Sequence, residues 1–187
     1  MKIISTVVAV TLLASMVQAD EVRVKQEGVK YIKMLGKELK TQLKAHMKAD
    51  PTGVAAMGFC AGKAEEITKE INAKLPKGVS VRRTALKTRS EKNAPDVTDT
   101  KVMEAYAKKA ADKSLDPKDI QVVEIAGATR VYKPLLIKPV CMKCHGDEAK
   151  ISSDIKAVIH KVYPKDMATG FKEGDFRGVI VSEIKKP

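Results

Sequence analysis

The residues best suited to chemistry in this sequence lie between positions 141 and 145. Cys141, Cys144 and His145 form the pattern C-x-x-C-H. Two thiols one helical turn apart can bond to two carbons on one edge of a porphyrin, and the adjacent imidazole can then reach its iron. The spacing therefore predicts one covalently attached c-type haem per chain. Cys141 and Cys144 would form the thioether bonds, and His145 would be the proximal axial ligand.

Two other kinds of site share part of this pattern. A C-x-x-C pair can form a structural disulfide or a redox dithiol, but redox pairs usually open a helix that follows a strand in a βαβ unit, and the sequence predicts no such unit here. Zinc needs four ligands, and the only further thiol is the distant Cys60, with no second spaced pair. Haem attachment is our prediction, and thiol redox chemistry and zinc binding stay open as alternatives.

The second axial ligand of a haem iron could be a methionine, a histidine or a cysteine. Cys60 is the only thiol outside the motif, and it lies on the apolar stripe of a predicted helix between the small residues Ala56 and Ala64. A buried cysteine that acts as a small hydrophobe explains the same pattern. His46 and His160 lie among lysines, which is typical of solvated surface histidines. Cys60 is therefore a candidate distal ligand.

Three arginines follow a predicted strand and could contact the carboxylates of a haem. Arg82, Arg83 and Arg89 lie within eight positions of one another, and guanidinium groups form bidentate contacts with carboxylates. They are candidates for contacts with the haem propionates, and a solvated basic face is the alternative.

Hydrophobic periodicity predicts the elements that must position these residues. Helices are expected over 22–48 (long and amphipathic), from Pro51 to about Leu75 with Asp50 as its cap, over 97–110, and weakly over 148–161. Strands are expected at 79–81, 120–125, 129–132 and 179–184, the middle two forming a hairpin around Gly127, with Pro134 making the continuation an edge or irregular segment. Helices followed by an antiparallel sheet predict the α+β class.

The first 19 residues have the features of a secretory signal peptide. Lys2 precedes an apolar run that ends in Val17-Gln18-Ala19, which predicts cleavage after Ala19 and a soluble, periplasmic product. An uncleaved N-terminal anchor is the alternative. Residues 20–187 are long enough for one domain, which we expect to be a single haem-binding domain.

The charge balance indicates the kind of partner. The chain has 35 Lys and Arg against 23 Asp and Glu, a formal net charge of +12. Such a surface favours an acidic exported partner for electron transfer or signalling. Nucleic acid is an improbable partner, because no recognition motif accompanies the charge and an exported protein is in the wrong compartment. After signal cleavage we expect no membrane association.

Several longer segments carry a resemblance to a known family. They are 81–96, which resembles the block R-x-S-x-K-x-R-N-P-x-N-x-P-D, Tyr132-Lys133-Pro134 ahead of the C-x-x-C-H motif, 163–171 and 174–178. Together they resemble the Tll-type c-haem family, a domain long catalogued without a function, over about residues 25–185. This chain departs from the family block at Ser90-Glu91, where Asn-Pro is usual, and at Ala85, where Ser is common.

The resemblance implies a PAS-like fold, in which an antiparallel sheet and helices pack around one haem. It also implies that the iron is bound by His145 and by a cysteine from an early helix, a position at which Cys60 stands. Family members occur as stand-alone exported proteins and as sensor domains of histidine kinases. We therefore expect one-electron transfer at low potential, with a redox or gas (NO/CO) sensor acting through a separate protein as the alternative. Two strong ligands leave no exchangeable position at the iron, so we expect no enzymatic activity.

Overall fold

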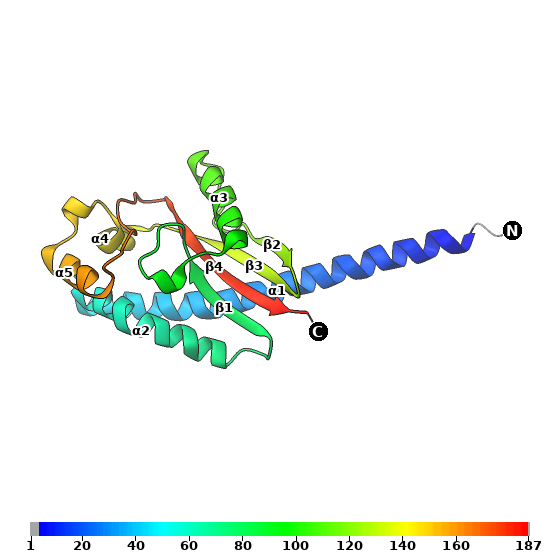
Figure 1. The fold of residues 1–187 in the computed structure, drawn as a ribbon, viewed down its shortest axis with the longest axis horizontal. Helices are drawn as coiled ribbons and strands as arrows, with labels where there is room; N and C mark the ends of the chain where they lie inside the picture. The colour runs from blue at the N-terminus through cyan, green and yellow to red at the C-terminus, as the bar shows by residue number, and fades with distance from the viewer. Residues whose placement is uncertain (1–3, 187) are drawn as a thin grey trace.

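A four-stranded antiparallel sheet forms the centre of the molecule. The computed structural model describes residues 4–186, and side chains from residue 20 onward. The strands are β1 (Val79–Thr84), β2 (Gln121–Ile125), β3 (Ala128–Leu136) and β4 (Phe176–Lys185), and they lie in the order β1-β4-β3-β2. Figure 1 shows helices on both faces of this sheet and a group of short helices at one end. The predicted α+β, PAS-like arrangement is confirmed.

Two long helices cover one face of the sheet. Helix α1 (Ile4–Ala49) crosses the strands, and α2 (Val54–Ala73) packs beside α1. Their shared core contains Ile32, Leu35, Ile71, Val81, Val131 and Ile180. At Gly28 the helix approaches the sheet so closely that an added Cβ would lie 2.6 Å from the Cβ of Val131. Only glycine permits this approach.

Helix α3 (Val97–Ala111) covers the opposite face. Its apolar side packs with Tyr132, Val179 and Val181 from the sheet. Its first turn contains Asp99, whose side chain is fully buried and accepts hydrogen bonds from the Arg82 guanidinium (2.7 Å) and the Tyr132 hydroxyl (2.9 Å). A buried carboxylate persists in a fold only when it is paired in this way.

A short helix, η1 (Glu91–Asn93), lies between β1 and α3. Four more lie between β3 and β4 in the sequence and gather at the end of the sheet opposite the start of α1 (Figure 1). They are η2 (Pro139–Cys141), α4 (Met142–His145), η3 (Glu148–Lys150) and α5 (Ser153–Val162). The sequence predicted one helix over 148–161. The structure divides it, because the Ser152 side chain caps a new helix by accepting a hydrogen bond from the Ile155 amide at 3.4 Å.

The start of α2 also differs from the prediction. A helix was expected from Pro51, but α2 begins at Val54, after Gly53 adopts a φ of 93°. The N-cap is therefore Gly53 and not Asp50 as predicted, although the Asp50 carboxylate accepts a hydrogen bond from the Ala55 amide at 2.9 Å. The expected edge character of Pro134 is confirmed, because β2 pairs with β3 only as far as Tyr132.

The predicted signal segment falls partly outside the described residues, which begin at Ile4. From there the backbone forms one continuous helix through Ala49, so cleavage after Ala19 stays a prediction. Across residues 4–186, no helix has the length and apolar character needed to cross a bilayer.

Candidate functional site

The C-x-x-C-H motif occupies η2 and α4, at the end of the sheet. Pro139 starts this turn, and the Lys138 amide donates a hydrogen bond to the Cys141 sulfur at 3.4 Å. Cys141 packs against the cluster formed by Ile137, Ala168 and Phe171, whereas Cys144 packs against Met57 and three isoleucines of the neighbouring cluster. All three cysteines are free thiols. One short helix therefore presents the two motif thiols to two adjoining apolar clusters.

His145 is held in a defined orientation. Its Nδ1 lies 2.7 Å from the carbonyl oxygen of Ala168, and its ring meets Phe171 edge-on. A carbonyl can only accept, so Nδ1 carries the proton and Nε2 keeps a free lone pair. Burial, assisted by Arg89, Arg177 and Arg83, lowers the pKa of His145 to about 3. The imidazole is therefore neutral, which is the form that binds a metal, and the carbonyl contact is the usual second partner of such a ligand.

Arg89 connects the segments around His145. Its guanidinium, only 10% exposed, forms an ion pair with Asp166 at 3.1 Å and donates to the carbonyls of Cys144 (2.6 Å) and Ala168 (3.2 Å). Asp166 in turn accepts a hydrogen bond from the Ala168 amide at 2.8 Å. Arg89 and Asp166 thus fix the carbonyl on which the His145 ring rests. We call these two residues the Arg89–Asp166 clamp.

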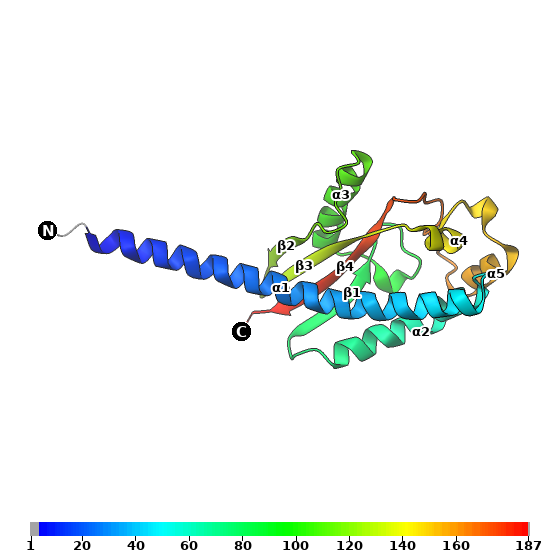
Figure 2. The same ribbon diagram turned by 180° about the vertical axis from the view of Figure 1, so that it is seen from behind.

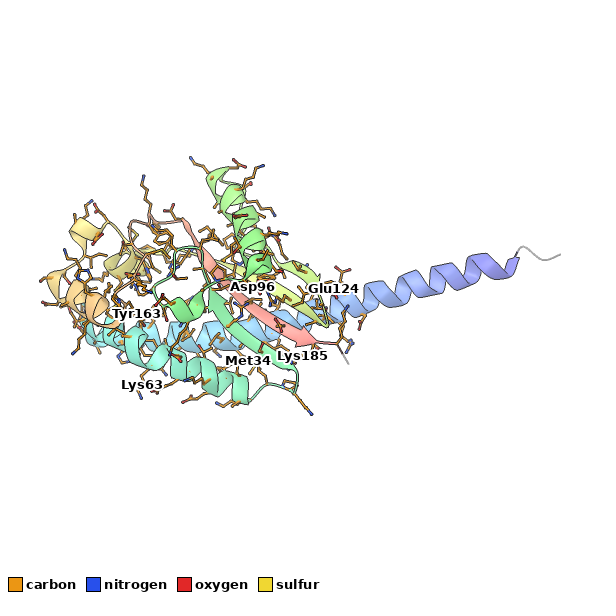
Figure 3. The ribbon with its side chains drawn as sticks, viewed as in Figure 1. Met34, Lys63, Asp96, Glu124, Tyr163 and Lys185 are labelled. Atoms are coloured by element: carbon orange, nitrogen blue, oxygen red, sulfur yellow. The ribbon has the colours of Figure 1, made fainter. Side chains whose placement is uncertain are left out.

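The structure brings Cys60 to the same place from α2. Cys60 packs on the cluster that also contacts Cys144, and its own carbonyl accepts a hydrogen bond from the Tyr163 hydroxyl at 3.2 Å. Figure 3 labels Tyr163. Burial raises the pKa of the Cys60 thiol, and the nearby charges of Arg83 and Arg89 oppose that rise. Burial also raises the pKa of Cys144, to about 11. Three thiols from two distant segments therefore border one region.

The three candidate arginines have different surroundings. Alternate residues of a strand point to opposite faces, so Arg82 turns to α3 and pairs with Asp99, whereas Arg83 turns to the α2 side. Burial lowers the pKa of Arg83, while the Cys60 thiolate would raise it. The guanidinium donors of Arg89 are already occupied by Asp166 and by the carbonyls of Cys144 and Ala168. Of the three, Arg83 is the one placed near Cys60 without an ion pair among the described residues.

Two cations near His145 were missed by the sequence reasoning. Arg177 lies over the Phe171 ring at 5.4 Å and donates to the Lys87 carbonyl at 2.9 Å, and Lys87 covers the same ring at 4.7 Å. Burial, followed by repulsion from Arg89, lowers the pKa of Arg177 to about 10. These side chains line a groove of about 410 Å³ beside Phe171. The segments 163–171 and 174–178, which carried the family resemblance, were the available signal.

Other candidate ligands lie elsewhere or are already occupied. Met103 belongs to the core on the α3 face, and Met167 is half exposed. His160 is exposed, as expected, but His46 stacks on Phe59 with ring centroids 4.9 Å apart. Across residues 4–186, no group of three or more His, Cys, Asp or Glu side chains could hold a metal ion.

Comparison with known proteins agrees with this architecture. No curated protein matches the chain. Among solved structures, the chain is similar to the crystal structure of the cyanobacterial heme-protein Tll0287, with 25% identity, a TM-score of 0.54, and coverage of 66% of this chain and 70% of that one. The model of the Tll0287-like family matches residues 7–185. The chain therefore belongs to the Tll0287-like family.

Proposed function

We propose that this chain is an exported protein that binds one haem c and transfers single electrons. The observation that carries the proposal is the convergence of the C-x-x-C-H motif, a neutral and oriented His145, and Cys60 at one end of the sheet. The similarity to a structure described as a heme-protein supports it. Bound haem would supply a one-electron Fe(III)/Fe(II) couple, whose potential a thiolate ligand would keep low by stabilising the ferric state.

Each side chain then has a defined part. Cys141 and Cys144 would hold the haem through two thioether bonds, and His145 would offer Nε2 to the iron while its protonated Nδ1 donates a hydrogen bond to the Ala168 carbonyl. Cys60, which α2 presents from the neighbouring cluster, would be the second protein ligand. The fit is chemically consistent, because every donor is either a thiol or a neutral imidazole with its second nitrogen satisfied.

The basic residues around the motif would balance the negative charge of the propionates. Arg83 and Arg177 are the candidates, since burial lowers the pKa of both guanidinium groups and neither forms an ion pair within residues 4–186. Buried charge of one sign is costly until a counter-charge arrives. Two carboxylates of a bound haem would meet that need.

A sensing function is the alternative, and one observation favours it. Cys60 lies on α2, which follows α1 after a connection of four residues. Loss of Cys60 from iron on reduction, or its displacement by NO or CO, would release one contact that positions α2. Because α2 packs along α1, that release could be passed to a separate protein.

Two measurements test the proposal. Haem staining of a denaturing gel should give a band for the secreted protein and none for the Cys141→Ala/Cys144→Ala variant. A band that survives in the variant, or no band at all, contradicts covalent attachment. In EPR, Cys60→Ser should change the ferric spectrum, with Ala61→Ser on the next residue as the matched control. An unaltered Cys60→Ser spectrum removes Cys60 from the iron.

The same samples separate transfer from sensing. Rapid reduction without a change of axial ligands favours electron transfer. Dissociation of Cys60 together with a change of shape, measured by absorption and small-angle scattering, favours sensing.

A further inference from the structure

The outer side of α1 carries an uninterrupted row of lysines. Lys30, Lys33, Lys37, Lys40, Lys44 and Lys48 follow one another at intervals of three or four residues, and all six are exposed. Residues at these intervals share one side of a helix. We call these six residues the lysine face. At 1.5 Å per residue it is about 27 Å long.

The opposite side of the same helix is fixed in the core, so the lysine face must point outward. Ile32 and Leu35 are almost completely buried against the sheet. Figure 2 shows α1 lying uncovered across this side of the domain. No other element of residues 4–186 is placed over it.

The lysine face is not neutralised within the protein. None of its six members forms an ion pair with a described residue, whereas Lys63 and Lys69 on α2 pair with glutamates at 2.8 and 3.2 Å. Like charges three or four positions apart destabilise a helix. This row of like charges adds nothing to the stability of the fold, but it would attract a partner of opposite charge.

Neighbouring residues add positive charge to the lysine face, and a shallow groove lies beside it. Burial lowers the pKa of Lys133 of β3, and the nearby positive charge of Lys33 lowers it further. Beside it, a shallow groove is lined by Val29, Met34 and the first lysines of the face. Cationic walls around a small apolar floor suit an acidic segment that also carries apolar side chains.

One end of the lysine face lies close to the C-x-x-C-H motif. It ends at Lys48, next to the connection in which the Pro51 carbonyl accepts a hydrogen bond from Lys143 at 2.7 Å, and Lys143 belongs to the C-x-x-C-H sequence. An acidic molecule held along α1 would therefore be adjacent to the proposed haem site.

We propose that the lysine face is the docking surface for an acidic protein partner. A second copy of this chain would present the same charge and be repelled. A lipid surface would gain little, because Val22 is the only large apolar side chain of α1 among residues 20–49 that is exposed. The partner's role as electron donor or acceptor rests on the proposed function, but its binding does not.

Binding can be tested without reference to haem. The probe is a fluorescein-labelled helical peptide with glutamates at every third or fourth position, and its affinity for the secreted protein is measured by fluorescence anisotropy between 20 and 200 mM salt. Lys33→Gln/Lys37→Gln/Lys40→Gln should weaken binding at low salt by about tenfold or more. Arginine at the same three positions should restore it, and the affinity should fall as salt rises.

The control removes the same charge elsewhere. Lys101→Gln/Lys108→Gln/Lys161→Gln alters three exposed lysines of α3 and α5 that form no ion pair with a described residue, and should change the affinity less than about twofold. Equal weakening by both triple variants would mean that net charge alone binds the peptide and would overturn the proposal. So would vesicles of phosphatidylglycerol that bind through these lysines when the peptide does not. A protein that lacks haem but binds the peptide would overturn the proposed function and leave the docking surface standing.

Discussion

Replacing Arg89 with methionine should strongly destabilise the protein. Its guanidinium is 10% exposed and Asp166 is 7% exposed, so the substitution leaves a buried carboxylate without its partner. It also removes the donors to the Cys144 and Ala168 carbonyls. Breaking a buried ion pair from one side costs about 3–5 kcal/mol, which we expect as the loss in free energy of unfolding.

The assay is urea unfolding of the secreted protein, followed by circular dichroism. Lys165→Met is the matched control, because Lys165 pairs with Glu91 at 2.9 Å while both are about 70% exposed. Removing such a surface pair costs about 0–1 kcal/mol. The double variant Arg89→Met/Asp166→Asn should recover part of the loss, since it leaves no unpaired charge.

A loss below about 1 kcal/mol in Arg89→Met, equal to that of the control, would refute the clamp. A second readout separates positioning from general stability. If the clamp orients His145, Arg89→Lys should fold and yet shift the reduction potential of the haem-loaded protein, whereas Lys165→Met should leave the potential unchanged.

Two further predictions concern the sheet. Gly28→Ala should lower the free energy of unfolding by about 1–3 kcal/mol, because the new Cβ would lie 2.6 Å from that of Val131. Gly36→Ala is the control and should cost less, because its Cβ would meet only the end of a side chain at 3.1 Å. A melting temperature of Gly28→Ala at or above that of Gly36→Ala would contradict the close approach. Asp99→Asn should lower the free energy of unfolding by about 2–4 kcal/mol, because it weakens the contacts of Asp99 with Arg82 and Tyr132. Haem staining should persist. Loss of the stain without loss of stability would contradict a purely structural role for Asp99.

Local sequence patterns predicted the parts of the site that depend on spacing. The C-x-x-C-H motif is contiguous, and the apolar stripe of α2 identified Cys60 as a residue on the packed side of its helix. The strand alternation likewise predicted the hairpin and the last strand. Each of these inferences uses contacts between residues a few positions apart.

The remaining parts depend on contacts that no local pattern records. Arg89 and Asp166 are 77 positions apart, and Arg89 and Cys144 are 55 apart. Arg82 and Arg83 are equivalent as sequence neighbours, but the strand turns them to opposite faces, one to Asp99 and the other towards Cys60. Which arginine serves which purpose is decided by the tertiary fold.

Covalent haem attachment is tested most directly by the intact mass of the protein secreted by cells that mature c-type cytochromes. We expect a polypeptide that starts at Asp20 and stays heavier by one haem after denaturation. A mass equal to that of the bare chain would contradict it.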